Sequence, residues 1–260
     1  MGMQEELEAT GKRYWDAQKG SGFRGLILLP FTILWSIFGA LFIAIIATVF
    51  SKWFKRKGWS LVRLWGRVPL WWHGIRLEIT GGERAAAPGA KLLLFNHVSV
   101  ADLLVLASIS PDSAVVIYKE EFHKIPGIGQ ALRALGCIAV DRSNKDRAMA
   151  SMAAAAERVR ATGAAVMMAP EGTRSRKGGL QEFKLGAFHL GVQTGAPLVP
   201  LVMRGIDQVS PMGSPLISSG VVAVDFLEPI SVEGLERKDV RALAERTREV
   251  FLEYLAPERS

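Results

Sequence analysis

The sequence predicts an α/β fold, with a mixed, largely parallel sheet flanked by helices and an N-terminal membrane-embedded helical segment. Two observations support this prediction. From about residue 77 onward, short apolar runs alternate with segments of helical periodicity, as expected when strands and helices follow one another along a chain. Before that point lies an uncharged apolar run long enough to cross a bilayer. We therefore expect membrane-anchoring helices at residues 1–76 and an α/β domain at residues 77–260.

The composition limits the possible partners. Hydrophobic residues make up 49% of the 260 residues, and the formal net charge is +7 at pH 7. These values favour contact with lipid and an anionic partner, which could be an acidic membrane surface, a phosphorylated substrate or nucleic acid. Nucleic acid is the least favoured, because the basic residues cluster beside the apolar segments and no nucleic-acid recognition motif is present.

The apolar run extends from residue 25 to residue 50 and carries no charge. Counted from Pro30, about 20 residues remain, which form roughly 30 Å of helix. The run is too long for a signal peptide, so we expect it to be retained. Basic residues flank both of its ends, which leaves open both a spanning helix and one that enters and returns on the same side.

A second segment, residues 59–75, holds four of the seven tryptophans, interleaved with Arg63 and Arg67. This composition is typical of an interfacial element that lies at the depth of the lipid headgroups. The alternative is a tryptophan-rich helix that packs on the globular domain.

The remaining sequence predicts seven strands and five helices in alternation. The strands are expected at residues 76–80, 91–95, 114–118, 137–141, 164–169, 198–203 and 221–226, and the helices at residues 100–108, 129–135, 146–161, 185–194 and 239–254.

The stretch LLLFNHVSVADLLVL, residues 92–106, places His97 and Asp102 inside an apolar run. Ser99 and Asp102 have the spacing of a capping box, so Asp102 could merely cap a helix, with His97 in the preceding loop. However, the carboxyl end of a strand is also where α/β proteins place their sites. A loop there can fold the imidazole onto the carboxylate, which would make His97 a general base.

The sequence offers this base no obvious protein nucleophile. No G-x-S-x-G motif is present, and the single cysteine, Cys137, falls in a predicted strand. The proton would therefore come from a bound acceptor alcohol. The other histidines lack partners at metal-ligand spacing, and we assign no metal.

A second polar cluster, PEGTR, follows the strand predicted at residues 164–169. An arginine beside a glycine turn is suited to bind a phosphate, with backbone N–H groups close by. The alternative is a solvated basic loop. Lys119 ends a third predicted strand, so these ends would converge with His97 in one site if the three strands are parallel.

Four blocks in this order resemble the glycerolipid acyltransferases, most closely the 1-acylglycerol-3-phosphate (lysophosphatidic acid) acyltransferases. They are NHVSVAD, KEEFHKIPGIGQALRALGCIAVDR, PEGTRS and APLVPLV, and the resemblance covers about residues 92–202. The family fold is an α/β domain on an N-terminal membrane-embedded helical pair. The resemblance implies that His97 and Asp102 are catalytic, that Pro200 contacts the acyl chain or donor, and that the acceptor is bound by Lys119, Glu171, Gly172, Thr173 and Arg174.

The implied reaction transfers an acyl chain from acyl-CoA or acyl carrier protein to the sn-2 hydroxyl of lysophosphatidic acid, giving phosphatidic acid in phospholipid biosynthesis. No cofactor beyond this co-substrate is expected. The expected location is the cell membrane, with the catalytic domain on the cytoplasmic face. One alternative is acylation of another lysophospholipid or of glycerol 3-phosphate. A non-catalytic, membrane-anchored protein that binds anionic lipid is the other.

Overall fold

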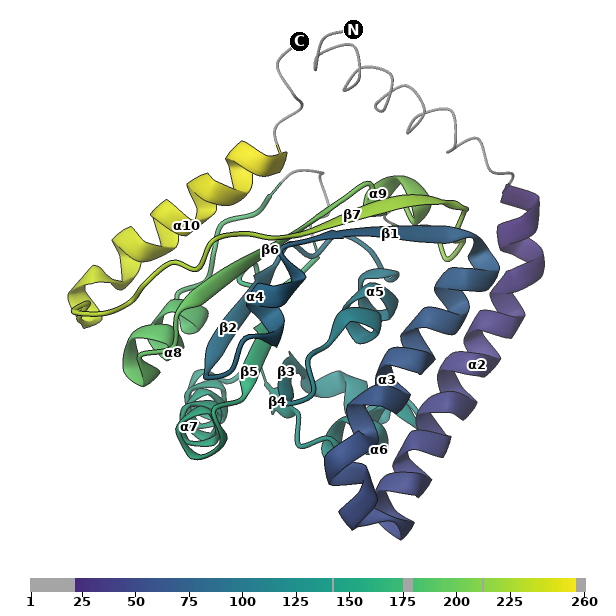
Figure 1. Cartoon of the computed structure of the whole chain (residues 1–260), viewed down its shortest axis with the longest axis horizontal. Coiled ribbons are helices and arrows are strands. Elements are labelled where there is room, and N and C mark those ends of the chain that lie inside the picture. Colours follow the sequence, from purple (N-terminus) through teal and green to yellow (C-terminus); the bar gives the residue numbers. More distant parts are fainter. Residues whose placement is uncertain (1–21, 142, 175–179, 212, 256–260) are drawn as a thin grey trace, which may run out of the picture.

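The structure, a computed structural model, describes residues 22–141, 143–174, 180–211 and 213–255 (Figure 1). The first 21 residues of the predicted membrane-anchoring part lie outside this range. Within it, the chain forms a seven-stranded sheet covered by helices on both faces. The α/β fold expected from the sequence is confirmed.

The sheet has the strand order β1-β7-β6-β2-β5-β3-β4. All neighbouring strands are parallel except β6 and β7, which are antiparallel, so β1 and β7 run opposite to the other five. Each predicted strand is present within one residue at either end. The strands are β1 (Ile75–Thr80), β2 (Lys91–Phe95), β3 (Ala114–Lys119), β4 (Ile138–Val140), β5 (Ala165–Met168), β6 (Leu198–Arg204) and β7 (Gly220–Phe226).

The five predicted helices are also present, with ends that differ by up to two residues. They are α5 (Asp102–Ile109), α6 (Ile128–Ala134), α7 (Lys145–Thr162), α8 (Gly186–Thr194) and α10 (Val240–Leu255). Four short elements were not predicted, because one turn of helix is too short to produce a periodic pattern. They are α4 (Gly82–Ala86), α9 (Ile206–Val209) and the 3₁₀ helices η1 (Glu120–Lys124) and η2 (Arg237–Asp239).

Side chains alternate between two apolar cores, one on each face of the sheet. In β2, for example, Leu93 and Phe95 join one core, while Leu92 and Leu94 join the other. The first core packs beneath α5, α6 and the N-terminal helices, and the second packs beneath α7, α8 and α10 (Figure 1). This alternation follows from the two-residue period of a strand.

The N-terminal segments form an antiparallel pair of helices, α2 (Gly22–Val49) and α3 (Ser51–His73), which lie side by side (Figure 1). Hydrogen bonds join residues 24–36 of α2 to residues 65–73 of α3. Trp35 Nε1 donates to the Trp65 carbonyl at 2.9 Å, and Thr32 Oγ1 lies 2.8 Å from His73 Nε2. We refer to α2 and α3 together as the hairpin.

The hairpin shares the first core with the sheet. Ala40 and Ile43 of α2 and Trp65 of α3 belong to the same buried cluster as Phe95 and Met167. The domain boundary expected after residue 76 stays a prediction. The hairpin and the sheet share one continuous core across this point of the sequence.

The outer surface of α2 is apolar. Phe23–Val49 is the one segment in the described part of the chain that is long and apolar enough to cross a membrane. In α3, by contrast, three of the four tryptophans predicted to be interfacial are at least partly buried, and only Trp71 is largely exposed, at 79%. The packing alternative therefore explains most of this tryptophan-rich segment.

Helix α3 approaches the backbone of α5 closely at Gly66. A Cβ atom added there would lie 2.5 Å from the Leu104 carbonyl oxygen and 2.7 Å from the Ser108 nitrogen. Only glycine permits this distance between the two helices, so the hairpin is seated directly on the helix that begins at Asp102.

We expect Gly66→Ala to destabilise the protein by about 1–2 kcal/mol, because overpacking of α5 outweighs the gain of about 1 kcal/mol in helix propensity. The melting temperature in detergent should fall by roughly 2–8 °C. The matched control is Gly186→Ala in α8, where the added methyl group meets only Met152 Cε at 4.0 Å. A Gly66→Ala melting temperature equal to or above that of the control would contradict the close approach.

Candidate active site

Three parallel strands bring the predicted polar residues to one edge of the sheet. β5 pairs with β2 on one side and with β3 on the other. His97 follows the end of β2, Glu171 follows the end of β5, and Lys119 is the last residue of β3. The convergence of these strand ends, expected if the strands are parallel, is confirmed.

His97 and Asp102 are in direct contact. His97 Nδ1 lies 2.6 Å from Asp102 Oδ2, and the imidazole is 32% exposed while the carboxylate is fully buried. An ionised carboxylate can only accept a hydrogen bond, so Nδ1 carries the proton and Nε2 keeps its lone pair. The imidazole is thereby held in the tautomer that can take a proton from a ligand.

The Asp102 carboxylate also organises the loop. Its Oδ2 accepts hydrogen bonds from the backbone N–H groups of Val98 and Ser99 at 2.7 and 3.0 Å. Half of the expected capping box is therefore present, whereas Ser99 Oγ accepts from the Ala101 N–H and not from Asp102. The capping function and the orientation of His97 use the same carboxylate oxygen, so the two interpretations of the sequence do not exclude each other.

Asn96 lets the chain leave the sheet just before His97. Its side chain accepts a hydrogen bond from the Met203 N–H at 2.8 Å and donates one to the Met203 carbonyl at 2.9 Å. The amide thus replaces a peptide group in the pairing of β2 with β6. The backbone of His97 is released from the ladder and can turn toward Glu171.

Glu171 is buried and bonded to two segments of backbone. Oε1 accepts from the His97 N–H at 2.9 Å, and Oε2 accepts from the Gln181 N–H at 2.8 Å. Burial raises the pKa of Glu171, and the two N–H donors oppose this shift. The carboxylate therefore ties the loop after β2 to the chain beyond the PEGTR turn.

The other predicted acceptor-binding residues lie at the same edge. Gly172 has φ +71°, a conformation that favours glycine, and it makes the turn into the exposed residues Thr173 and Arg174. Lys119 is about half exposed, and its ammonium pairs with Glu121 at 2.7 Å. This bond is the main cause that lowers the pKa of Glu121.

Pro200 lies apart from this group. It is buried in the middle of β6, opposite Leu94, and its carbonyl accepts from the Leu227 N–H. Its neighbours Val199 and Leu201 belong to the first core, which places Pro200 on the other face of the sheet. The expected contact of Pro200 with the acyl chain or donor stays a prediction. Its position on the other face of the sheet does not favour such a contact.

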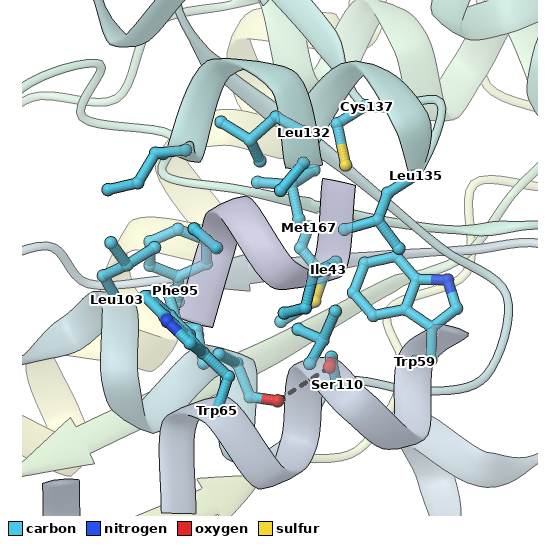
Figure 2. Close-up of a pocket in the computed structure, with 17 residues that line it drawn as sticks. Ile43, Trp59, Trp65, Phe95, Leu103, Ser110, Leu132, Leu135, Cys137 and Met167 are labelled. Carbon is cyan, nitrogen blue, oxygen red and sulfur yellow. Dashed lines mark hydrogen bonds between the residues drawn. The ribbon is translucent and has the colours of Figure 1, made fainter. Parts of the chain in front are cut away.

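An apolar pocket lies on the first face of the sheet (Figure 2). Its volume is about 90 Å³, and it is partly open to solvent. The pocket is enclosed by the hairpin, α5, α6 and the sheet, through residues such as Ile43, Trp59, Leu103, Leu132 and Met167. Phe95 also lines it, and the centre of the Phe95 ring lies 6.0 Å from the centre of the His97 ring.

The lining of the pocket fits a hydrocarbon. None of the lining residues carries a charge. Ser110 is the only one with a hydroxyl group, and its Oγ donates to the Ala107 carbonyl at 2.8 Å (Figure 2). The sequence did not reveal this pocket, because its residues have the same apolar pattern as ordinary core residues.

Cys137 lines the pocket but is not suited to act as a nucleophile. Burial raises the pKa of its thiol to about 12, so the thiolate is scarce at neutral pH. No group of three or more His, Cys, Asp or Glu side chains that could hold a metal occurs within the described residues. The predicted lack of a metal or other cofactor stays an expectation.

The chain is similar to known proteins over most of its length. The Acyltransferase family model matches residues 76–204. The 1-acyl-sn-glycerol-3-phosphate acyltransferase alpha of Mus musculus is 35% identical over 181 residues, which cover 69% of this chain and 64% of the mouse protein. The 1-acyl-sn-glycerol-3-phosphate acyltransferase of Salmonella typhimurium is 28% identical over 235 residues, which cover 90% of this chain and 92% of the bacterial protein.

A solved structure has the same fold. The 1-acyl-sn-glycerophosphate (LPA) acyltransferase PlsC from Thermotoga maritima superposes with a TM-score of 0.74 at 20% identity, covering 90% of this chain and 99% of that protein. The family resemblance of the four sequence blocks is thus confirmed, although this chain spans less than two thirds of the length of the mouse relative. The chain belongs to the Acyltransferase family, and residues 76–204, which contain His97 and Asp102, are its family domain.

Proposed function

We propose that the protein transfers an acyl chain from a thioester, acyl-CoA or acyl carrier protein, to the sn-2 hydroxyl of lysophosphatidic acid. The observation that carries this proposal is the His97–Asp102 contact of 2.6 Å, which lies beside Phe95 of an uncharged apolar pocket and on the sheet edge that also bears Lys119 and Arg174. A base, a hydrocarbon pocket and cationic side chains are the three features that an acylation of a lipid phosphate requires. The names of the relatives support the same acceptor.

The reaction follows from the position of the imidazole. His97 Nε2 takes the proton of the sn-2 hydroxyl while that oxygen attacks the thioester carbonyl. When the tetrahedral intermediate collapses, the C–S bond breaks, and the imidazolium returns its proton to the leaving thiolate. The buried Asp102 carboxylate stabilises the imidazolium in between.

The backbone amides nearest to His97 are already used as donors. The N–H groups of His97, Val98 and Ser99 bond to Glu171 or Asp102. The oxyanion of the tetrahedral intermediate therefore needs donors from another part of the site.

Lys119 and Arg174 are the candidates to hold the acceptor phosphate. Both are exposed at the edge of the sheet, and an exposed pair such as Lys119–Glu121 contributes little, so the ammonium can exchange Glu121 for a phosphate. Gly172 supplies the turn that carries Arg174. For Glu171 we propose a positioning role, because both of its oxygens already accept backbone N–H groups.

We further propose that the hairpin binds one face of the cell membrane and does not span it. If α2 crossed the bilayer, α3 packed beside it would carry Lys57, Arg63 and Arg67 into the hydrocarbon. Each such charge costs several kcal/mol there. The apolar outer surface of α2 can instead enter a single leaflet, with the α/β domain on the cytoplasmic side as the expected orientation.

His97→Ala should lower kcat by about 10²- to 10⁴-fold, the usual contribution of a general base. The measurement is thiol release from acyl-CoA in the presence of lysophosphatidic acid, with the melting temperature as a check of folding. His189→Ala is the matched control, because His189 lies on α8 on the other face of the sheet. A folded His97→Ala protein with near-normal turnover would exclude His97 as the base.

Arg174→Ala should raise the KM for lysophosphatidic acid about tenfold or more, because a charged hydrogen bond to the phosphate is lost. The KM for the acyl donor should change little. The exposed Arg241 of α10 provides the control variant, Arg241→Ala. A panel with glycerol 3-phosphate and other lysophospholipids tests the acceptor class, and equal rates with an acceptor that lacks a phosphate monoester would refute the assignment.

Trp71→Glu should weaken binding to liposomes about tenfold or more, because the exposed indole can no longer bury its apolar surface in the lipid. Co-sedimentation with liposomes measures this binding. Met149→Glu is the control, since Met149 is an exposed apolar residue of α7, on the face of the sheet opposite the hairpin. Equal losses in the two variants would contradict membrane binding through the hairpin.

A further inference from the structure

The last helix, α10, reaches the segment that follows the PEGTR turn through one arginine. Arg248 Nε donates to the Gln181 carbonyl and Arg248 Nη2 donates to the Leu180 carbonyl, both at 3.1 Å. The two carbonyls belong to consecutive peptide groups, so one guanidinium fixes two planes of the backbone. Such bonds from a charged donor are stronger than those between neutral groups.

The same segment is held by aromatic contacts. Phe183 packs edge to face against Phe251 of α10, with ring centres 5.4 Å apart, and it stacks on Phe188 at 6.0 Å. The Lys184 N–H also donates to the Pro170 carbonyl at 2.7 Å. Residues 180–184 are thus packed between α10 and the start of the PEGTR turn.

One peptide group connects Arg248 to Glu171. The carbonyl of the Leu180–Gln181 peptide accepts from Arg248, and the N–H of the same peptide donates to Glu171 Oε2. A positive charge on the carbonyl polarises the amide and strengthens its N–H as a donor. The Arg248 guanidinium therefore strengthens a hydrogen bond to the buried Glu171 carboxylate without contacting that carboxylate.

The connection continues to the imidazole. Glu171 Oε1 accepts from the His97 N–H, and the His97 ring bonds to Asp102. An unbroken series of hydrogen bonds thus runs from the C-terminal helix to the residue proposed as the base. Helix α10 lies beyond residues 76–204, where the family model matches, and beyond the four sequence blocks.

We propose that Arg248 is a positioning residue that holds the acceptor-binding turn and, through Glu171, the loop of His97. Glu171 fixes the start of the turn that carries Arg174, and Arg248 holds residues 180 and 181, so loss of Arg248 should loosen the phosphate site more than the pocket for the acyl chain. This inference rests on the proposed function for its kinetic consequence. Its structural consequence does not depend on the reaction.

The first test is hydrogen exchange of the full-length protein in detergent. In Arg248→Ala, the amides of Gln181, Lys184 and His97 should exchange about tenfold faster than in the wild type, because their hydrogen bonds open more often. Arg246→Ala, an exposed arginine of the same helix, is the matched control and should leave these amides unchanged. Unchanged exchange in Arg248→Ala would overturn the proposal, whatever the activity.

The second test is a split of kinetic parameters. Arg248→Ala should raise the KM for lysophosphatidic acid about tenfold and leave the donor KM within about twofold of the wild-type value. The acceptor KM of Arg248→Lys should lie between those of the wild type and Arg248→Ala, because an ammonium lacks the planar fork that reaches both carbonyls. Equal changes in both KM values would overturn the role in acceptor binding.

The two tests separate the proposals. If the wild-type protein releases no thiol with any lysolipid, the proposed function fails, and hydrogen exchange still decides whether Arg248 positions the loop. If Arg248→Ala does not fold, Arg248→Lys takes its place in both measurements, with faster exchange and a raised acceptor KM as the expected results.

Discussion

The hydrogen bond between His97 and Asp102 depends on a carboxylate that water does not reach, and much of the molecule serves to keep it so. Asp102 begins α5, and α5 is covered by α3 at a distance that only Gly66 permits. The hairpin is thus part of the enclosure of the site as well as a candidate membrane anchor. In a low-dielectric setting the carboxylate attracts an imidazolium more strongly than it would in water. The helices proposed to bind the membrane and the residues proposed for catalysis are therefore coupled by packing.

The two faces of the sheet support different parts of the proposed site. On one face, Phe95 and the hairpin enclose a pocket without charges, next to the His97 ring. At the carboxyl edge, Glu171 connects the catalytic loop to the turn that carries Arg174. Beyond that turn, α10 on the second face holds residues 180–184. The proposed base lies where the apolar and the charged regions meet, as the proposed acylation of a lipid phosphate requires.

Regular elements were predictable from the sequence because their signals are local. The run KLLLF gives β2 its limits, and helical periodicity gives α7 and α10 theirs to within one residue. The pairing of His97 with Asp102 was also predictable, since the two lie at the end of a strand and the start of a helix. The roles of Asn96 and Arg248 were not. Asn96 bonds to Met203 and Arg248 bonds to residues 180 and 181, and contacts over such separations along the chain leave no periodic signal in a single sequence.

The continuous core beneath the hairpin bears on any attempt to obtain a soluble catalytic fragment. Removal of α2 and α3 would expose α5 and the sheet side chains Leu93, Phe95 and Met167, which are buried in the intact chain. A fragment that begins at β1 would expose an apolar face of the sheet to solvent and would self-associate. Solubility has to be engineered on the outer surface of α2, by polar replacement of its exposed apolar side chains, while the inner surface of the hairpin is left as it is.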